Sequence, residues 1–306
     1  MIHHRVIYMA IVFCALIAKE SQAETKAVLT LGDEIRIPLV HIKAGRFEMG
    51  RSSDGALVGA LLSHGEQGDW ATEGPMRKVT ITKGFSIGKF KITCGQFCAF
   101  LNSTDKAAKH VNINEYSWIE KRNGKYHPKE GKSEYPINVA HWEGAAAFCR
   151  WASDTSGRTV RLPTEAEWEY VARGAAGRRY PWGTKDISSW TSPSGAAVDA
   201  FPDNKTPEGV VGMVDVVVGE WCSDYYGVRY IPNDTIDPKG PSKNQLPIKS
   251  DLNWLATVEG EYHVQRGRVV PSNWSTTSRS FGDRVDDAGI YGFRIVMELD
   301  GKDKSP

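Results

Sequence analysis

The chain has 306 residues, of which 41% are hydrophobic, and it contains 10 Trp, 11 Tyr and 10 Phe. This content is ample for a folded core, in one large domain or in two. The formal net charge is +1, and the sequence has no basic stripe with interleaved aromatic residues, which argues against nucleic acid as a partner.

Residues 1–23 have the pattern of a secretory signal. A polar, basic start at residues 3–5 precedes an apolar run from Val6 to Ala18, which is too short to span a bilayer. The small residues Ser21 and Ala23 follow at the position of a cleavage site. An alternative makes Cys14 a lipidated cysteine. Either interpretation predicts an exported chain, at the cell surface or in the periplasm, with a lipid anchor in the second case.

Cleavage after Ala23 leaves residues 24–306, which we expect to form a single domain, since no linker or internal repeat divides them. Their four cysteines do not have the spacing of common zinc sites. Two alternatives stay open: one disulfide between Cys149 and a cysteine of the 94/98 pair, or four small buried side chains. The four are Cys94, Cys98, Cys149 and Cys222.

The N-terminal part of this domain predicts β structure, because apolar and polar residues alternate between glycine-rich turns. In order, the predicted elements are a strand at Ile35–Val40, a second strand that closes on Gly50, a loop at Ser52–Glu73, a strand at Arg77–Thr82 and its continuation at Phe85–Ile92.

Three helices are predicted next. Thr93 is placed to cap a helix that runs through Asn102, and a second helix covers His141–Ser153. Thr164 begins the third, where Glu167 completes a capping box. The chain from Tyr180 to Pro271 is rich in loops, with short strand candidates at Met213–Val218 and Glu220–Tyr225.

The C-terminal run begins with a strand at His263–Arg266 and ends with a strand at Tyr291–Val296. About two dozen residues without a clear period lie between them. A loop of that length inside a compact domain is usually functional or disordered, and the firm strand behind it argues for function.

The composition of residues 268–294 is unusual. Lys, Glu, Gln, Met and Trp make up 60 of the 306 residues, so about five are expected among these 27, and Trp274 is the one found. A loop rich in Gly, Ser and Asp is also naturally poor in these residues, so two explanations of the deficit stay open.

A series of motifs occurs in order along the chain: GRFEMG, FSIGKFKIT, INVAHWEGAAAFCRWAS, RLPTEAEWEYVARG, YPWG, GEWCSDYYG and YGFRIV. Together they resemble the formylglycine-generating-enzyme family, also called sulfatase-modifying-factor domains, over roughly residues 38–297. The resemblance implies an α+β fold of the C-type-lectin type with little regular secondary structure.

The sequence departs from this family where its enzymes carry a pair of cysteines five residues apart, with which they oxidise a substrate cysteine using copper and oxygen. Those positions fall near Ser275 and Ser280, and the chain has no cysteine after Cys222. A serine hydroxyl cannot supply a thiolate ligand for Cu(I). We therefore expect no catalytic residue here and no cofactor, with calcium as an open alternative.

The family's calcium-binding motif is also altered. The stretch from Asp215 to Trp221 is two residues shorter than in relatives and lacks their asparagine. Glu220 and Asp224 remain as candidate oxygen ligands for calcium. The alternative is that both are buried acids in an ordinary hydrogen-bond network.

The same scaffold is used by the variable proteins of diversity-generating retroelements, in which adenine-directed mutagenesis rewrites the last segment and cannot produce Lys, Glu, Gln, Met or Trp. The resemblance suggests a non-catalytic binding protein whose segment 268–294 recognises a protein or surface ligand. Trp274, Arg279 and Arg284 are expected to belong to the fixed frame. The candidate contact residues are Arg268, Val270, Ser272, Asn273, Ser275, Thr277, Ser280, Phe281, Asp283, Val285, Asp286 and Tyr291.

Two other functions are compatible with the sequence. An exported oxidoreductase resembling the siderophore-maturation members of the family would hold its substrate under the C-terminal loop. Its candidate residues would be His141, Glu220, Asp224 and Tyr225. An invariant accessory protein of the cell envelope is the other alternative, and identical C-terminal sequences across strains would favour it.

Overall fold

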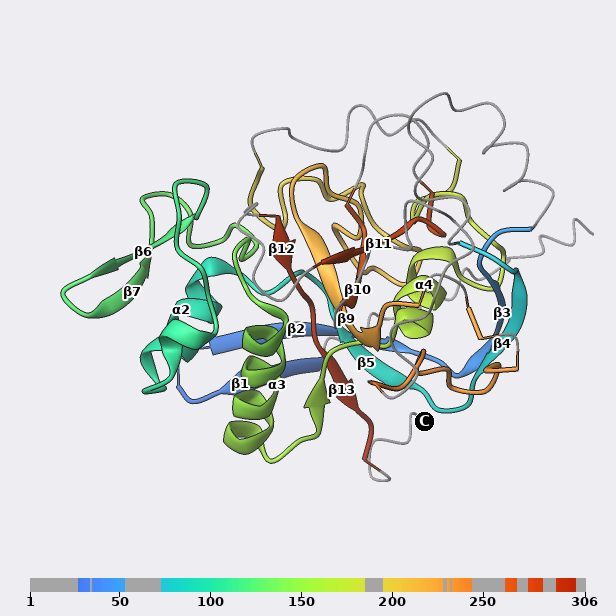
Figure 1. Cartoon of the computed structure of the whole chain (residues 1–306), viewed down its shortest axis with the longest axis horizontal. Helices are drawn as coiled ribbons and strands as arrows, with labels where there is room; N and C mark the ends of the chain where they lie inside the picture. The colour runs from blue at the N-terminus through green and yellow to red at the C-terminus, as the bar shows by residue number, and fades with distance from the viewer. Residues whose placement is uncertain are drawn as a thin grey trace, which may run out of the picture.

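The computed structural model describes residues 27–33, 35–52, 73–184, 195–227, 230–231, 233–243, 262–268, 275–282 and 290–300 (Figure 1). The predicted signal at residues 1–23, with Cys14, lies outside these residues, as does most of the predicted loop at 52–73. In the described part of the chain, no helix combines the length and the apolar character that a membrane crossing requires.

The larger sheet joins the two ends of the described chain. Its strands have the order β1-β2-β5-β13-β8 and all neighbours are antiparallel. Alternation in β1 and in the first half of β2 buries every second side chain, as expected for a sheet with one covered face. The bounds are β1 Ala27–Leu31, β2 Ile35–Ile42, β5 Phe85–Gly88, β13 Val296–Glu298 and β8 Val160–Arg161.

Two antiparallel pairs flank this sheet. Strands β3 (Gly45–Met49) and β4 (Arg77–Ile81) form one pair, and β6 (Ile119–Arg122) and β7 (Lys125–Pro128) form the other. The turn of the second pair is Asn123-Gly124, with φ of 50° and 79°. Positive φ at both positions is the geometry of a tight hairpin turn, which Asn-Gly favours.

The second sheet has the order β11-β10-β9-β12 and carries the C-terminal segment. Its strands are β9 Gly219–Tyr225, β10 His263–Arg266, β11 Arg279–Gly282 and β12 Tyr291–Gly292. Strand β12 runs parallel to β9, whereas the other neighbours are antiparallel. Figure 1 shows this sheet beside α4 (Glu165–Arg173), whose residues contact β9 and β10.

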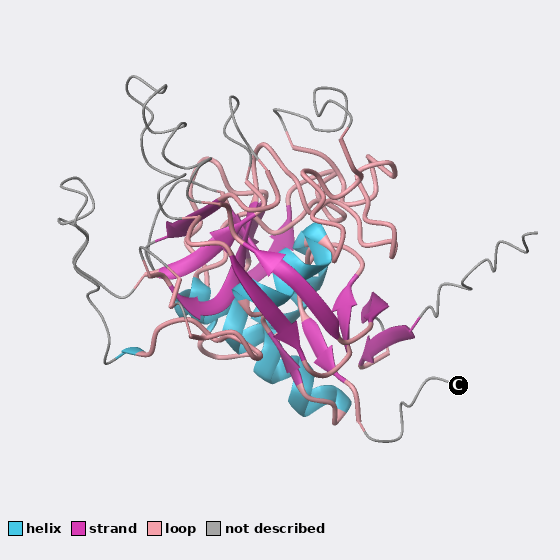
Figure 2. Ribbon diagram, turned by 90° about the vertical axis from the view of Figure 1, so that its right-hand side faces the viewer, coloured by secondary structure: helices cyan, strands magenta, loops and turns pink. Residues whose placement is uncertain are grey.

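The helices begin where the sequence predicts. Helix α2 (Cys94–Asn102) and α4 each start with a complete capping box, from Thr93 with Gln96 and from Thr164 with Glu167. Helix α3 (Trp142–Ser156) ends at Gly157, which adopts a left-handed conformation. Figure 2 shows the helices packed against the strands and the loops gathered at one end of the molecule.

Aromatic residues fill the core between α2, α3 and the C-terminal strand. Phe293 meets Phe97 and Phe148 edge-on, with ring centroids 5.8 and 5.4 Å away. Edge-to-face packing of this kind stabilises beyond the burial of area alone. Phe293 thus ties the end of the chain to both helices.

Three predicted details differ from the structure. The strand predicted at Tyr291–Val296 is divided into β12 and β13, because residues 293–295 pass from the second sheet to the first while their side chains stay buried. The candidate at Met213–Val218 forms no strand and makes a single bridge, Asp215 with Arg268. The irregular C-terminal run contains β11, which the sequence pattern did not indicate.

Candidate functional site

The C-terminal segment is anchored by two arginines that lie opposite each other on β10 and β11. Arg266 and Arg279 are partners in the strand register, and both are buried. Like charges in such a position repel. Glu165 of α4 compensates them: its Oε1 accepts hydrogen bonds from Arg266 Nη1 at 3.0 Å and Arg279 Nε at 2.7 Å, and its Oε2 accepts from Arg279 Nη2 at 2.8 Å.

A second glutamate of α4 completes this group. Glu169 lies one helical turn after Glu165, so both side chains share the face that meets the sheet. Its Oε2 accepts a hydrogen bond from Arg266 Nη2 at 2.7 Å, and its Oε1 accepts one from the Gly50 amide at 2.7 Å. We call Arg266, Arg279, Glu165 and Glu169 the arginine frame. The sequence predicted Arg279 as a residue of the fixed frame, but the two glutamates were not predicted. A signal for them was available, namely two acidic residues four apart on the buried face of a helix.

A separate ion pair fixes the chain after the segment. Arg294 donates from Nε and Nη2 to the two carboxylate oxygens of Glu220, at 2.5 and 2.7 Å, and from Nη1 to the Gly88 carbonyl at 2.9 Å. Trp168 Nε1 also donates to Glu220 at 2.9 Å. These side chains are all buried. The segment is therefore held by buried ion pairs on both sides, the arginine frame before it and Arg294 with Glu220 after it.

Two hydroxyls of the segment belong to a buried hydrogen-bond chain. Thr277 Oγ1 donates to Glu73 Oε2 at 2.6 Å, and the Ser275 and Thr277 hydroxyls lie 2.6 Å apart. Arg51 donates to Ser275 Oγ at 3.0 Å and pairs with Glu73 at 2.9 Å. Burial raises the pKa of the Glu73 carboxyl. Ser275, one of the serines near the expected cysteine positions, is therefore a structural hydrogen-bonding group.

The predicted contact residues divide into three sets. Arg268, Ser280 and Phe281 are half-buried. Ser275, Thr277 and Tyr291 are buried, at 6%, 4% and 5% exposure, so the structure corrects our expectation that they are exposed. Their hydroxyls and ring pack inward, where they support the segment. The others lie outside the described residues: Val270, Ser272, Asn273, Asp283, Val285 and Asp286, as do the expected frame residues Trp274 and Arg284.

The residues considered for an oxidoreductase come from two elements: Glu220, Asp224 and Tyr225 lie on β9, and His141 directly precedes α3. His141 is the N-cap residue of α3 without a side-chain capping bond, and Glu220 is held by Arg294. Tyr225 instead stacks on His263, which also stacks on Trp142 with centroids 3.6 Å apart and planes at 7°. This stack joins α3 to the second sheet and has a structural role that the sequence did not reveal.

The two calcium candidates are engaged in hydrogen bonds. Both oxygens of Glu220 accept from Arg294, so a cation there would have to displace a guanidinium. Asp224 Oδ2 accepts from the Glu165 amide at 2.9 Å and from the Ser223 hydroxyl at 3.1 Å. Burial, followed by the charge of Glu165, raises the pKa of Asp224 to about 7. Across the described residues, no three His, Cys, Asp or Glu side chains are arranged to hold a metal.

The four described cysteines are free and buried. This arrangement matches the alternative of small buried side chains rather than a disulfide. Burial raises the pKa of each thiol, to about 12 for Cys98 and well above the ordinary value for Cys222. A thiol with a raised pKa contributes little thiolate at neutral pH and is a poor nucleophile.

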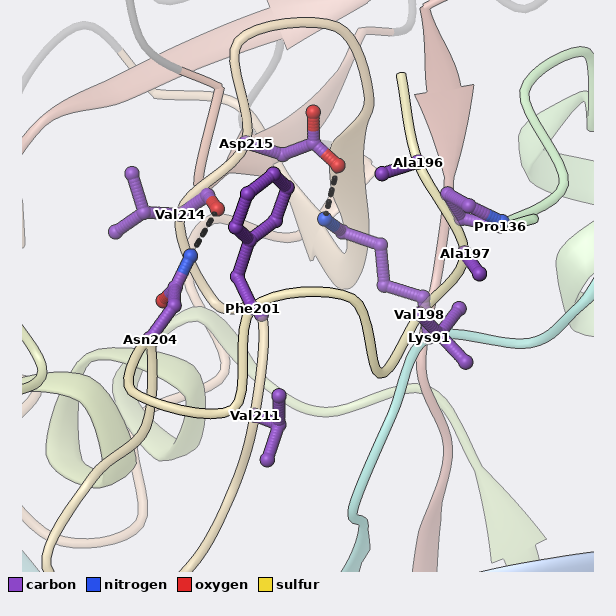
Figure 3. Close-up of a pocket in the computed structure, with 11 residues that line it drawn as sticks. Lys91, Pro136, Ala196, Ala197, Val198, Phe201, Asn204, Val211, Val214 and Asp215 are labelled. Carbon is purple, nitrogen blue, oxygen red and sulfur yellow. Dashed lines mark hydrogen bonds and ion pairs between the residues drawn. The ribbon is translucent and has the colours of Figure 1, made fainter. Parts of the chain in front are cut away.

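A pocket of about 40 Å³ lies beside the start of the segment (Figure 3). Lys91 Nζ donates to Asp215 Oδ2 at 2.9 Å inside it, and Asn204 donates to the Val214 carbonyl at 2.8 Å. Apolar side chains such as Phe201 and Val211 form its walls. The volume holds about three water molecules, so the pocket is too small for an organic substrate of ordinary size.

Comparison with curated proteins identifies relatives named as enzymes, one of them as an inactive enzyme. The chain is 28% identical over 235 residues to the formylglycine-generating enzyme of Mus musculus, covering 60% of each chain. It is 29% identical over 318 residues to the inactive C-alpha-formylglycine-generating enzyme 2 of Bos taurus, covering 88% of this chain and 90% of that one. It also matches the serine/threonine-protein kinase Pkn1 of Chlamydia trachomatis, at 28% identity over 79% of this chain. The chain thus spans 60% of the mouse enzyme and 38% of the kinase.

Two solved structures share the fold. PvdO from Pseudomonas aeruginosa superposes with a TM-score of 0.64 at 22% identity, over 90% of this chain and all of that one. Treponema denticola variable protein 1 superposes with a TM-score of 0.62 at 17% identity, over 90% and 99%. These likenesses confirm the predicted α+β fold. The family described as the sulfatase-modifying factor enzyme 1-like domain matches residues 30–299. The chain therefore belongs to the sulfatase-modifying factor family.

Proposed function

We propose that this chain is a non-catalytic, exported binding protein that recognises a protein or surface ligand through residues 268–294. The observation that carries the proposal is the lack of a thiol in this segment, where the family's oxidising enzymes have two. Ser275 is instead committed to a buried hydrogen-bond chain, and the sequence has no cysteine beyond Cys222. Copper-dependent oxidation would lack its thiolate ligands.

The arginine frame gives the segment a rigid base, which supports recognition. Binding sites hold their geometry best when the first layer of residues rests on side chains fixed by packing and hydrogen bonds. Arg266 and Arg279 form ion pairs with the glutamates of α4, and the β10–β11 pairing places the two arginines opposite each other. The side chains of Arg268 and Ser280 take no part in these ion pairs, so they can change without loss of the frame's buried contacts.

The comparisons are compatible with this proposal. One relative carries the word inactive in its name, and one structural neighbour is named a variable protein. Family membership alone does not determine function, since one fold hosts many sites. The proposal therefore depends on the segment itself and on the test below.

A binding comparison with matched variants tests the proposal. The protein would be screened against purified extracellular and surface proteins, and each binder measured with Arg268→Ala/Ser280→Ala and with a control, Lys121→Ala/Arg122→Ala, on the exposed β6–β7 hairpin. We expect the segment variant to weaken binding about tenfold or more, which corresponds to about 1.4 kcal/mol of binding free energy. The control should keep the parent affinity.

Two outcomes would contradict the proposal. If the segment variant and the control variant both bind as tightly as the parent protein, the ligand site lies elsewhere on the molecule. Stoichiometric copper binding with oxygen consumption in the presence of a thiol substrate would make the chain an oxidase. At the DNA level, we expect a nearby copy of the 3′ coding region that differs mainly at adenines, beside a reverse transcriptase gene. If no such copy is found, the segment is not diversified, and the alternative of an invariant envelope protein is favoured.

A further inference from the structure

The loop at residues 113–118, which leads into β6, exposes two large hydrophobic side chains. Tyr116 is 61% exposed and Ile113 is 38% exposed. Single exposed hydrophobic residues are common on protein surfaces, and Val28 and Ile236 are examples elsewhere on this molecule. Two within four positions of one short loop are a local concentration rather than single cases, and such concentrations mark interaction sites.

Hydrogen bonds hold this loop in one conformation. Asn114 Oδ1 accepts from the Tyr116 amide at 2.9 Å, and the Asn114 amide donates to the Ser117 hydroxyl at 2.8 Å. Asn138, which is 1% exposed, donates from Nδ2 to the Tyr116 carbonyl at 2.9 Å and accepts from the Trp118 amide at 3.1 Å. A tyrosine on a fixed backbone loses little conformational entropy when a partner covers its ring.

Asn138 also connects this loop to the end of the C-terminal segment. Its carbonyl accepts a hydrogen bond from the Tyr291 amide at 2.9 Å. The next residue, Val139, forms a parallel bridge with Tyr291. Since Tyr291 begins β12, the loop that carries Tyr116 is anchored beside this strand.

The start of the segment lies at the same end of the second sheet. Arg266 of β10 and Gly292 of β12 both pair with Glu220, which lies between them on β9. Two strand spacings therefore separate these residues, a distance of about 10 Å. Arg268 comes two residues after Arg266, and Tyr291 directly precedes Gly292. Arg268 and the loop just described thus adjoin one end of the sheet.

The pocket in Figure 3 lies between these two sides. Asp215, which forms a bridge with Arg268, is part of its wall. Pro136, two residues before Asn138, is another part of the same wall. A partner that covers this pocket would meet Arg268 on one side and the loop on the other.

We propose that Tyr116 is a fixed contact residue for the ligand of the C-terminal segment, and that this ligand is a folded protein. The inference rests on the proposed binding function and extends it to a residue outside 268–294. Contacts separated by about 10 Å or more fit within an ordinary protein–protein interface, which has about 20–30 residues on each side. Tyrosine is enriched in such interfaces, because its ring offers a large apolar area and its hydroxyl a polar group.

Photo-crosslinking with the full chain, in cells that produce it naturally, tests this surface. Benzoylphenylalanine (Bpa) is placed at one position at a time, as Tyr116→Bpa, Arg268→Bpa or the control Lys125→Bpa, at an exposed residue that begins β7. We expect the first two variants to form an adduct with the same protein, identified by mass spectrometry, and the control to form none.

Every other outcome overturns the inference and separates it from the proposed function. An adduct from Arg268→Bpa alone would leave the segment as the binding site and remove Tyr116 from it. Different proteins at the two positions would divide the surface in two. An adduct from Tyr116→Bpa alone, or from neither variant, would contradict the proposed function as well. An adduct of Tyr116→Bpa with a second copy of this chain would identify a self-association surface instead.

Affinity for the crosslinked protein then measures what the ring contributes. Tyr116→Ala should weaken binding about tenfold or more, as truncation of an aromatic hot-spot residue does. Tyr116→Phe keeps the ring and should stay within about threefold of the parent, as should the control Lys125→Ala. Because Tyr116 is exposed, Tm should change by less than about 2 °C in each variant. Parent affinity in Tyr116→Ala would overturn the inference.

Discussion

Glu165→Gln is the substitution that tests the arginine frame most directly, since it removes one charge and almost no volume. Glu165 is 4% exposed and accepts three charged hydrogen bonds from two arginines at 2.7–3.0 Å. Breaking a buried ion pair typically costs about 3–5 kcal/mol, because the remaining charge stays buried without its partner. Here Arg266 and Arg279 would face each other with Glu169 alone to compensate them.

We therefore expect a loss of about 3–5 kcal/mol in the free energy of unfolding, and a fall in Tm of about 6–20 °C for a domain of this size. Urea and thermal denaturation, followed by circular dichroism, measure both quantities. Hydrogen exchange should increase first in residues 262–268 and 275–282. Glu120→Gln, in an exposed pair with Arg122, is the matched control and should cost less than about 1 kcal/mol.

A double-mutant cycle refines this test. Removing Arg279 as well, with Glu165→Gln/Arg279→Met, should cost less than the sum of the two single substitutions, since neither charge is then left without a partner. A loss below about 1 kcal/mol for Glu165→Gln, equal to that of the control, would refute the view that the frame holds the segment.

Three further predictions concern titration, thiols and the core. Because the pKa of Asp224 is raised to about 7 in the folded state, its protonated carboxyl stabilises the fold below its unfolded pKa, and this contribution is lost as pH rises through 7. Asp224→Asn should therefore flatten the decline in unfolding free energy between pH 4 and pH 8. The four described cysteines should react with a disulfide reagent at pH 8 only after unfolding, which mass spectrometry of labelled peptides can establish. Phe293→Ala should destabilise by about 3–5 kcal/mol, as urea denaturation would show, because it opens a cavity between α2 and α3.

Local signals in the sequence were sufficient for the helices. Thr93 and Thr164 each stand directly before their helix, and each capping box depends on residues three apart. The fold itself followed from the ordered motifs. Strand pairing could not be predicted from local patterns, since β5 pairs with β13 although the two strands lie far apart in the sequence.

The site was harder to predict than the fold. The burial of Thr277 depends on Glu73, which is 204 residues away in the sequence. A Ser- and Thr-rich run was interpreted as exposed, because composition cannot reveal a distant acceptor.

The passage of the chain from β12 to β13 has a consequence for biosynthesis. Residues 291–298 pair with β9 in one sheet and with both β5 and β8 in the other. The larger sheet cannot form completely until this stretch has left the ribosome, because β13 lies between β5 and β8, so stable folding must follow translation of almost the whole domain. A nascent chain without its last strand exposes the edges of β5 and β8, which are the edges that this strand covers in the folded protein.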